Sequence, residues 1–153
     1  PPPERMSNLD AGLALIQLSK LSEIVRRRVR NAKVMSEVLR GVDKVETPSG
    51  SYPGHVFTKY AIRVKDGSVD SAYDRAKTLV RMAKYLARRG VEVEWLYTPL
   101  HLRRSLDRYK RVELRKTEEL YRRTICVPIN PFLTEEQVAH IGVLVKVFLE
   151  HDR

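Results

Sequence analysis

The feature of this sequence that most constrains its fold is a stretch of small and apolar residues near its start. Residues 11–19, AGLALIQLS, carry no charge, although the chain as a whole is rich in arginine and lysine. Ser7 or Asn8 is a favourable helix N-cap and Gly41 a favourable stop, so the pattern predicts one helix that ends near Leu39. Its first third is apolar on every side, which is typical of a helix that is covered on every side. A single domain of 153 residues has little room to provide that cover.

The later part of the same helix is amphipathic, with basic residues on one side and an apolar seam on the other. The seam follows alternating spacings of four and three residues, interrupted by Arg28. Its apolar members are Ala14, Leu18, Leu21, Val25, Ala32, Met35 and Leu39. We therefore expect the helix to pass from an enclosed environment to the surface of a domain.

Four later segments have the composition of short strands. Alternation is clearest at 55–64, where the predicted inward side chains are Val56, Thr58, Tyr60, Ile62 and Val64. It recurs at 91–95, and shorter strands are expected at 44–47 and 124–129. These segments are too few and too short for a large sheet, so the pattern predicts a sheet of about three to four strands.

Helical patterns separate these strands. A second helix, capped by Ser68 or Asp70, is expected to end before Gly90, and a short helix is expected at 118–123. The last helix, at about 134–150, opens with a threonine and a glutamine at capping-box spacing. The order predicts an α/β fold in which helices cover a small sheet after a long N-terminal helix.

The charge of the chain permits anionic partners without selecting one. The 29 basic and 19 acidic residues give a formal charge of +10. Arginine pairs and triplets occur on four separate elements, and no aromatic residues alternate with them to stack on bases. Solvated faces and ion pairs therefore explain them better than a nucleic-acid interface, and nucleic acid is disfavoured as a partner.

Composition also bears on compartment. No apolar run is long enough to cross a membrane, and no secretory signal pattern opens the chain. Cys126 is the one cysteine, and the histidines have no ligands at metal-site spacing, so a reduced, cytoplasmic protein without a metal site is expected. The chain has few asparagines and glutamines and more arginine than lysine, a bias that favours a thermophilic source.

Three separated segments form a set in fixed order. They are RMSNLDAGLALIQLSKL at 5–21, LYTPLHLRRS at 96–105, and EELYRRTICVPINPFLTEEQVAHIGVLVKVFLE at 118–150. The set resembles the DegT/DnrJ/StrS family of pyridoxal-phosphate-dependent sugar aminotransferases. The first segment is similar to the family's Arg-Met-Ser helix, the second to its Pro-Leu-His-Leu segment, and the third to its closing strand and helix.

The resemblance implies the small domain of a fold-type-I aminotransferase. Residues 1–41 would be a helix of the interdomain type and residues 42–153 a small α/β domain, together one compact unit. In the family the lysine that binds pyridoxal phosphate lies upstream, in a large domain. The resemblance therefore implies pyridoxal phosphate for the full-length protein, and neither a catalytic residue nor a bound cofactor for this chain alone.

The resemblance also transfers a few candidate substrate contacts. His101 matches the histidine of Pro-Leu-His, which faces the sugar in the family, and Tyr97 roughly matches the tyrosine of the same motif. Arg5 matches the motif arginine near the active site. Pro3 stands where the family has an asparagine that reaches the cofactor phosphate of the neighbouring subunit. A missing large domain or a second subunit would cover Leu9 to Leu18.

Two functions remain open from the sequence. In one, the chain contributes to the substrate cleft and dimer contacts of a sugar aminotransferase and is inactive alone. In the other, it is a stand-alone, non-catalytic module that binds a partner protein or an anionic ligand such as nucleic acid. Whether the chain is part of an enzyme depends on which function holds.

Overall fold

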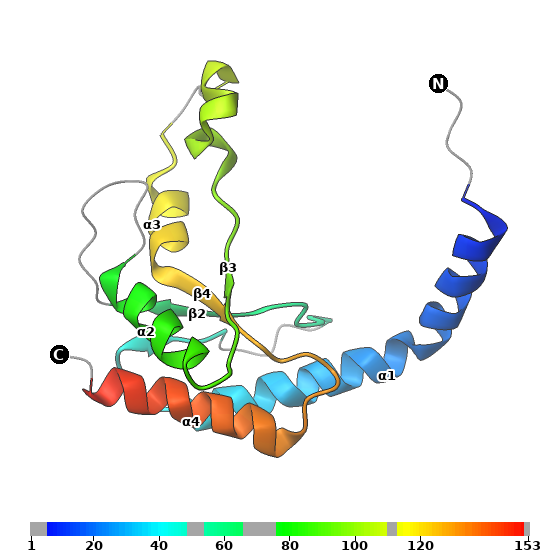
Figure 1. Cartoon of the computed structure of the whole chain (residues 1–153), viewed down its shortest axis with the longest axis horizontal. Coiled ribbons are helices and arrows are strands. Elements are labelled where there is room, and N and C mark those ends of the chain that lie inside the picture. The colour runs from blue at the N-terminus through cyan, green and yellow to red at the C-terminus, as the bar shows by residue number, and fades with distance from the viewer. Residues whose placement is uncertain (1–5, 49–53, 66–75, 110–112, 152–153) are drawn as a thin grey trace.

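The computed structural model describes residues 6–48, 54–65, 76–109 and 113–151, and Figure 1 shows their arrangement. The helices are α1 (Asn8–Val38), α2 (Lys77–Ala87), α3 (Arg115–Arg123) and α4 (Glu135–His151), with 3₁₀ turns η1 (Leu100–Leu102) and η2 (Arg104–Tyr109). The strands are β1 (Val45–Glu46), β2 (Tyr60–Val64), β3 (Glu94–Trp95) and β4 (Thr124–Val127). They form one antiparallel sheet in the order β1-β2-β4-β3, so the predicted α/β fold with a small sheet is confirmed.

Helix α1 begins and ends close to where the sequence predicts. The hydroxyl of Ser7 accepts a hydrogen bond from the amide of Asp10 at 3.1 Å, which caps the first turn. The second half of α1 runs alongside α4 below the sheet, while its first half extends away from the rest of the molecule (Figure 1). The seam is accordingly buried only at its end, at Ala32, Met35 and Leu39.

The first half of the seam is exposed in this chain. Leu18 and Leu21 are exposed, and the large apolar side chains before them are exposed as well. The helix continues there because local hydrogen bonding and good helix formers sustain it, whereas burial requires a partner surface.

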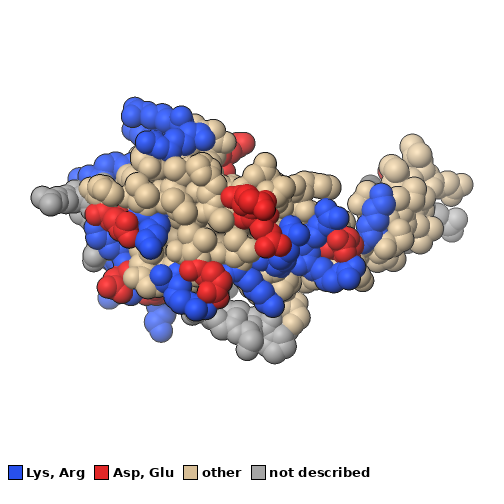
Figure 2. Space-filling view, turned by 90° about the horizontal axis from the view of Figure 1, so that it is seen from below, with Lys and Arg blue, Asp and Glu red and all other residues tan. Residues whose placement is uncertain are grey.

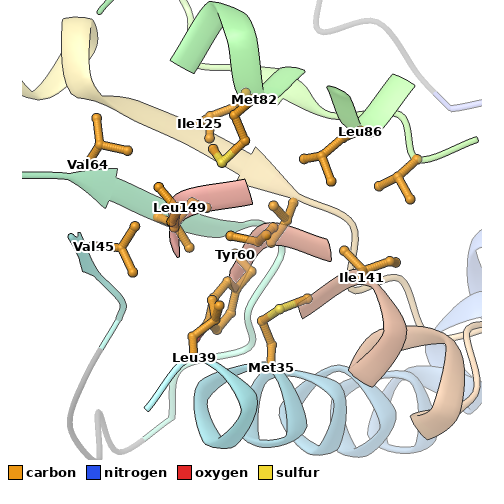
Figure 3. Close-up of a cluster of buried hydrophobic side chains, with 14 of the residues drawn as sticks. Met35, Leu39, Val45, Tyr60, Val64, Met82, Leu86, Ile125, Ile141 and Leu149 are labelled. Carbon is orange, nitrogen blue, oxygen red and sulfur yellow. The ribbon is translucent and has the colours of Figure 1, made fainter. Parts of the chain in front are cut away.

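The core lies between the sheet and helices α1, α2 and α4 (Figure 3). Tyr60 and Ile62 of β2 and Ile125 of β4 are fully buried in this cluster. In Figure 3, Ile125 lies beside Met82 of α2, and the ring of Tyr60 points toward Met35 and Leu39 at the end of α1. Helix α4 starts with the predicted capping box. The amide of Gln137 donates to the Thr134 hydroxyl at 3.2 Å, and the Thr134 amide donates to the Gln137 side chain at 2.9 Å.

Helices α1 and α4 approach each other closely at one glycine. A Cβ atom placed on Gly142 would lie 2.8 Å from Cγ1 of Val38 and 3.3 Å from the sulfur of Met35. Nearby, the buried Asn31 donates to the carbonyl of Asn130 at 2.8 Å, which joins α1 to the loop before α4. The second half of α1 is thus fixed by both packing and a buried polar contact.

Strand β2 starts later than the alternation predicts. Val56 and Thr58 are exposed, because Phe57 has a φ of 47° and the chain bends there before it becomes extended. The guanidinium of Arg28 donates to the carbonyl oxygens of Phe57 and Thr58, at 3.4 and 2.9 Å. The charged residue that interrupts the seam of α1 therefore stabilises this bend.

Helix α2 also starts later than predicted. Ala76 has a ψ of 131°, so a helix that runs unbroken through this residue is ruled out and α2 begins at Lys77. The two predicted caps, Ser68 and Asp70, lie outside the described residues. Strand β3 occupies only the last two residues of the predicted 91–95, and α3 begins three residues before the predicted 118–123.

Candidate functional site

The Pro-Leu-His segment and helix α3 bring three ionisable side chains together. Nε2 of His101 lies 3.1 Å from Oε1 of Glu118, and the other carboxylate oxygen accepts from the guanidinium of Arg122 at 3.0 Å. Glu118 and Arg122 are one turn apart on α3, so both project from the same helix face. We call these three residues the histidine cluster.

The cluster is largely shielded from solvent. The side chains of His101, Glu118 and Arg122 are 10%, 14% and 22% exposed. The His101 ring beside it, with help from Arg122, holds the pKa of the Glu118 carboxyl below its usual range, against the opposing effect of burial. Glu118 is therefore an ionised, acceptor-only partner for the imidazole near neutral pH.

Local structure explains how His101 reaches this position. Pro99 precedes η1 in an extended conformation, and the buried Leu102 anchors the turn from the other side. A second contact joins the same two segments, since the hydroxyls of Thr98 and Tyr121 lie 3.3 Å apart. The turn and α3 are therefore tied together at two points.

Tyr97 lies apart from the histidine cluster in its contacts. It is 76% exposed, and the ammonium of Lys59 sits 4.7 Å from the centre of its ring. Lys59 also forms an ion pair with Glu94 of β3. Arg5 and Pro3 lie outside the described residues.

The sequence singled out His101 but not its partners. Glu118 lies 17 residues further along the chain, and only the fold shows that the two side chains meet. The one available signal was the i,i+4 spacing of Glu118 and Arg122 on a predicted helix, which indicates an ion pair and nothing about a histidine.

Hollows formed by the described residues lie on the surface beside the sheet. One, of about 850 Å³, lies between the second half of α1 and β1, and is lined mainly by apolar side chains such as Val29 and Phe57. The other, of about 580 Å³, lies near β3 and β4 and includes Lys59 and Cys126. Among the residues that the structure describes, no group of three potential ligands could hold a metal ion.

The residues of the second hollow do not fit covalently bound pyridoxal phosphate. A lysine that forms a Schiff base must present a neutral amine. The ammonium of Lys59 donates a hydrogen bond to the carboxylate of Glu94, which raises the pKa of Lys59 and keeps it protonated. As an ammonium, Lys59 is therefore unsuited to hold this cofactor as a Schiff base.

The second notable surface is the start of α1. The exposed fractions of Leu9, Leu13, Leu15, Ile16 and Leu18 range from 52% to 74%. In Figure 2 the end of the molecule formed by this helix is mostly free of charged atoms, whereas basic and acidic groups intermingle over the body. We call residues Leu9 to Leu18 the apolar start of α1. No helix in the described ranges is both long and apolar enough to cross a membrane.

Comparison with known proteins identifies relatives over nearly the whole chain. Residues 3–146 match the model of the DegT/DnrJ/EryC1/StrS aminotransferase family. The dTDP-4-dehydro-2,3,6-trideoxy-D-glucose 4-aminotransferase of Saccharopolyspora spinosa is 26% identical over 95% of this chain and 35% of its own length.

Solved structures agree with this match. The aminotransferase TlmJ from Streptoalloteichus hindustanus is 28% identical, with a TM-score of 0.76 over 92% of this chain and 36% of its own. DesV from S. venezuelae, at 21% identity, shares the fold with a TM-score of 0.82 over 97% of this chain and 38% of its own. The chain thus spans little more than a third of the length of these relatives, and it belongs to the DegT/DnrJ/EryC1/StrS aminotransferase family.

Proposed function

We propose that this chain acts as the small domain of a pyridoxal-phosphate-dependent sugar aminotransferase. The observation that carries the proposal is the match of residues 3–146 to the aminotransferase family, combined with coverage of 35–38% of the relatives. The remaining part of such an enzyme, a large domain, would supply the cofactor lysine. The chain would contribute one wall of the substrate cleft.

The substrate would be a keto or amino sugar linked to a nucleotide. His101, Tyr97 and Arg5 are the proposed substrate contacts. An imidazole can accept or donate a hydrogen bond to a sugar hydroxyl near neutral pH, and an exposed tyrosine offers both a ring face and a hydroxyl. When bound to the large domain, pyridoxal phosphate supplies the electron sink for amino-group transfer.

The apolar start of α1 would be covered in the working enzyme. Its five large aliphatic side chains are exposed here, and burial of each such side chain is worth about 1.5–3 kcal/mol. We propose that the large domain, a second subunit or both lie against it. A dimer contact at this position would make the helix a shared element of both subunits.

The proposal is tested by comparing this chain with the full reading frame that encodes it. Each is incubated with pyridoxal phosphate and then with borohydride, which fixes a Schiff base as a stable adduct. We expect the longer protein to be labelled and this chain to remain unlabelled, because in the family the lysine that binds the cofactor lies upstream of the residues matched here. An adduct on this chain, or none on the longer protein, would contradict the proposal.

Substrate contact is tested separately in the longer protein. Replacement of His101 by asparagine is expected to reduce amino transfer to a nucleotide-linked keto sugar by about 10²-fold or more if the ring relays a proton. The control is His140→Asn, on the exposed part of α4 and outside the histidine cluster. Equal activity of the wild-type protein and the His101→Asn variant would exclude His101 from the substrate site.

A second candidate function is favoured by the same apolar surface. A stand-alone module that binds a partner protein would also expose an apolar helix before binding. Nucleic acid is a poorer candidate for this partner. Basic and acidic groups intermingle on the face shown in Figure 2, and Glu23 neutralises Arg26 and Arg27 of α1 through ion pairs. A native start codon just before residue 1 would favour this function, and an upstream lysine-bearing domain would exclude it.

A further inference from the structure

We propose that Glu118 is a positioning residue that fixes the tautomer of His101, with the proton on Nε2 and the acceptor lone pair on Nδ1. The inference rests on the proposed function, because it assigns a role to His101 at the substrate cleft. It goes further by naming two residues, Glu118 and Arg122, that act on substrate only through that imidazole.

The hydrogen-bonding capacity of each group determines the tautomer. An ionised carboxylate can only accept, so the nitrogen at 3.1 Å from Oε1 of Glu118 must carry a hydrogen. A neutral imidazole has one ring hydrogen, which leaves Nδ1 as the acceptor. In the part of the chain that the structure describes, the recorded polar contact of this ring is the one through Nε2.

Arg122 keeps the carboxylate in the required state. Its guanidinium donates to Oε2 at 3.0 Å, so each oxygen of Glu118 has its own donor. The guanidinium of Arg122 thus orients the carboxylate of Glu118, and the carboxylate in turn orients the imidazole of His101. An exposed pair at the start of this helix differs: Glu113, just before α3, and Arg115 lie 3.4 Å apart and are 73% and 89% exposed, so water screens their interaction.

The backbone around the cluster limits its movement. The carbonyl of Arg122 accepts from the amide of Ala76 at 3.0 Å, and the next residue, Arg123, donates to the carbonyl of Lys65 at 2.8 Å. With the contact between Thr98 and Tyr121, three connections fix α3 relative to the sheet and to the turn that carries His101. The carboxylate is therefore presented by an anchored helix, as a positioning role requires.

The proton balance of the step is simple. Nδ1 of His101 accepts a proton from a substrate hydroxyl or ammonium group, and the ring becomes an imidazolium that retains the hydrogen on Nε2. The carboxylate of Glu118 stabilises this cation without taking its proton, and Nδ1 later returns the proton to substrate or water. Glu118 itself need not touch the substrate.

The experiment is NMR of the chain labelled with ¹⁵N-histidine, which needs neither cofactor nor substrate. The tautomer follows from long-range correlations between ring carbon-bound protons and the two nitrogens, and hydrogen exchange of the ring N–H reports its hydrogen bond. We expect the hydrogen of His101 on Nε2. In Glu118→Gln, where a neutral partner replaces a charged one, we expect its exchange to be about fivefold to tenfold faster.

The matched control is Glu119→Gln, which removes a neighbouring carboxylate on α3 that lies 3.7 Å from Arg123. It should leave the ring of His101 unchanged. A hydrogen on Nδ1 in the wild-type chain would overturn the proposal, as would equal exchange rates in the folded Glu118→Gln variant.

If Glu118→Gln does not fold, Glu118→Asp provides the comparison, because it retains the charge but withdraws it by one methylene group. The same faster exchange is then expected, and an unchanged rate overturns the proposal. If the longer protein shows no amino transfer while the ring behaves as expected, the proposed function fails and the positioning of His101 stands.

Discussion

The two halves of α1 show opposite relations between composition and burial. The first half is rich in leucine and is exposed, whereas the second half, rich in arginine, includes the fully buried Asn31, Ala32 and Met35. The second half has a partner in α4, to which it is joined by Gly142 and by the loop at Asn130. Apolar composition therefore indicates a need for cover, and only a facing surface within the chain provides it.

The strongest test of this contrast removes a large side chain from each half. Met35→Ala leaves a cavity between α1, the sheet and α4, and is expected to lower the free energy of unfolding by about 2–5 kcal/mol. Leu13→Ala removes an exposed side chain and should change the free energy of unfolding by less than about 0.5 kcal/mol. Urea denaturation measures both values. Equal losses in the two variants would mean that the first half of α1 is buried in the folded chain.

Alanine at Gly12 of α1 and at Gly142 of α4 should change the stability of the fold in opposite directions. Gly142→Ala brings a methyl group within 2.8 Å of Val38 and is expected to destabilise the fold by about 1–3 kcal/mol. At Gly12 no atom lies within 4 Å of the added carbon, and alanine has the higher helix propensity. Gly12→Ala is therefore expected to raise the free energy of unfolding by up to about 1 kcal/mol. Thermal unfolding shows whether the midpoint of each variant rises or falls relative to wild type. A higher midpoint in both variants would mean that α1 and α4 lie further apart than described.

A smaller effect is expected from acid. The folded-state pKa of Glu118 lies below its unfolded value, so its pairing stabilises the fold above the unfolded pKa, about 4.3. That contribution is lost as the pH falls through the folded pKa. Unfolding midpoints measured from pH 6 to pH 2 should fall less steeply at the acid end in Glu118→Gln than in the wild-type chain. Parallel curves would show that Glu118 makes no such contribution.

Much of the fold could be predicted from sequence because its signals are local. The Ser7 cap, the capping box of Thr134 and Gln137, and the period of Ile62 and Val64 depend on residues close in sequence. The prediction failed where a single backbone angle overrode the pattern, as at Phe57, whose left-handed conformation ends the alternation.

The candidate site was less predictable, because its geometry depends on distant parts of the chain. His101 was found through a motif, and its partners Glu118 and Arg122 become visible only when η1 packs beside α3. The exposure of Leu15 and its neighbours, by contrast, agrees with the sequence, because a helix start that is apolar on every side needs more cover than a domain of this length provides. The predicted division at residue 41 and the substrate roles of Tyr97 and Arg5 stay predictions.

The central claim is that the apolar start of α1 is an interface that drives self-association of this chain when no large domain covers it, and the molecular mass of the chain in solution tests this most directly. Light scattering over a concentration series should give a mass of two or more chains for the wild-type protein. For Leu15→Glu it should give the mass of one chain. Phe132→Glu, which changes a still more exposed apolar side chain in the loop before α4, should behave as wild type. A wild-type chain that stays monomeric at the highest concentration, with α1 intact by circular dichroism, would contradict the claim.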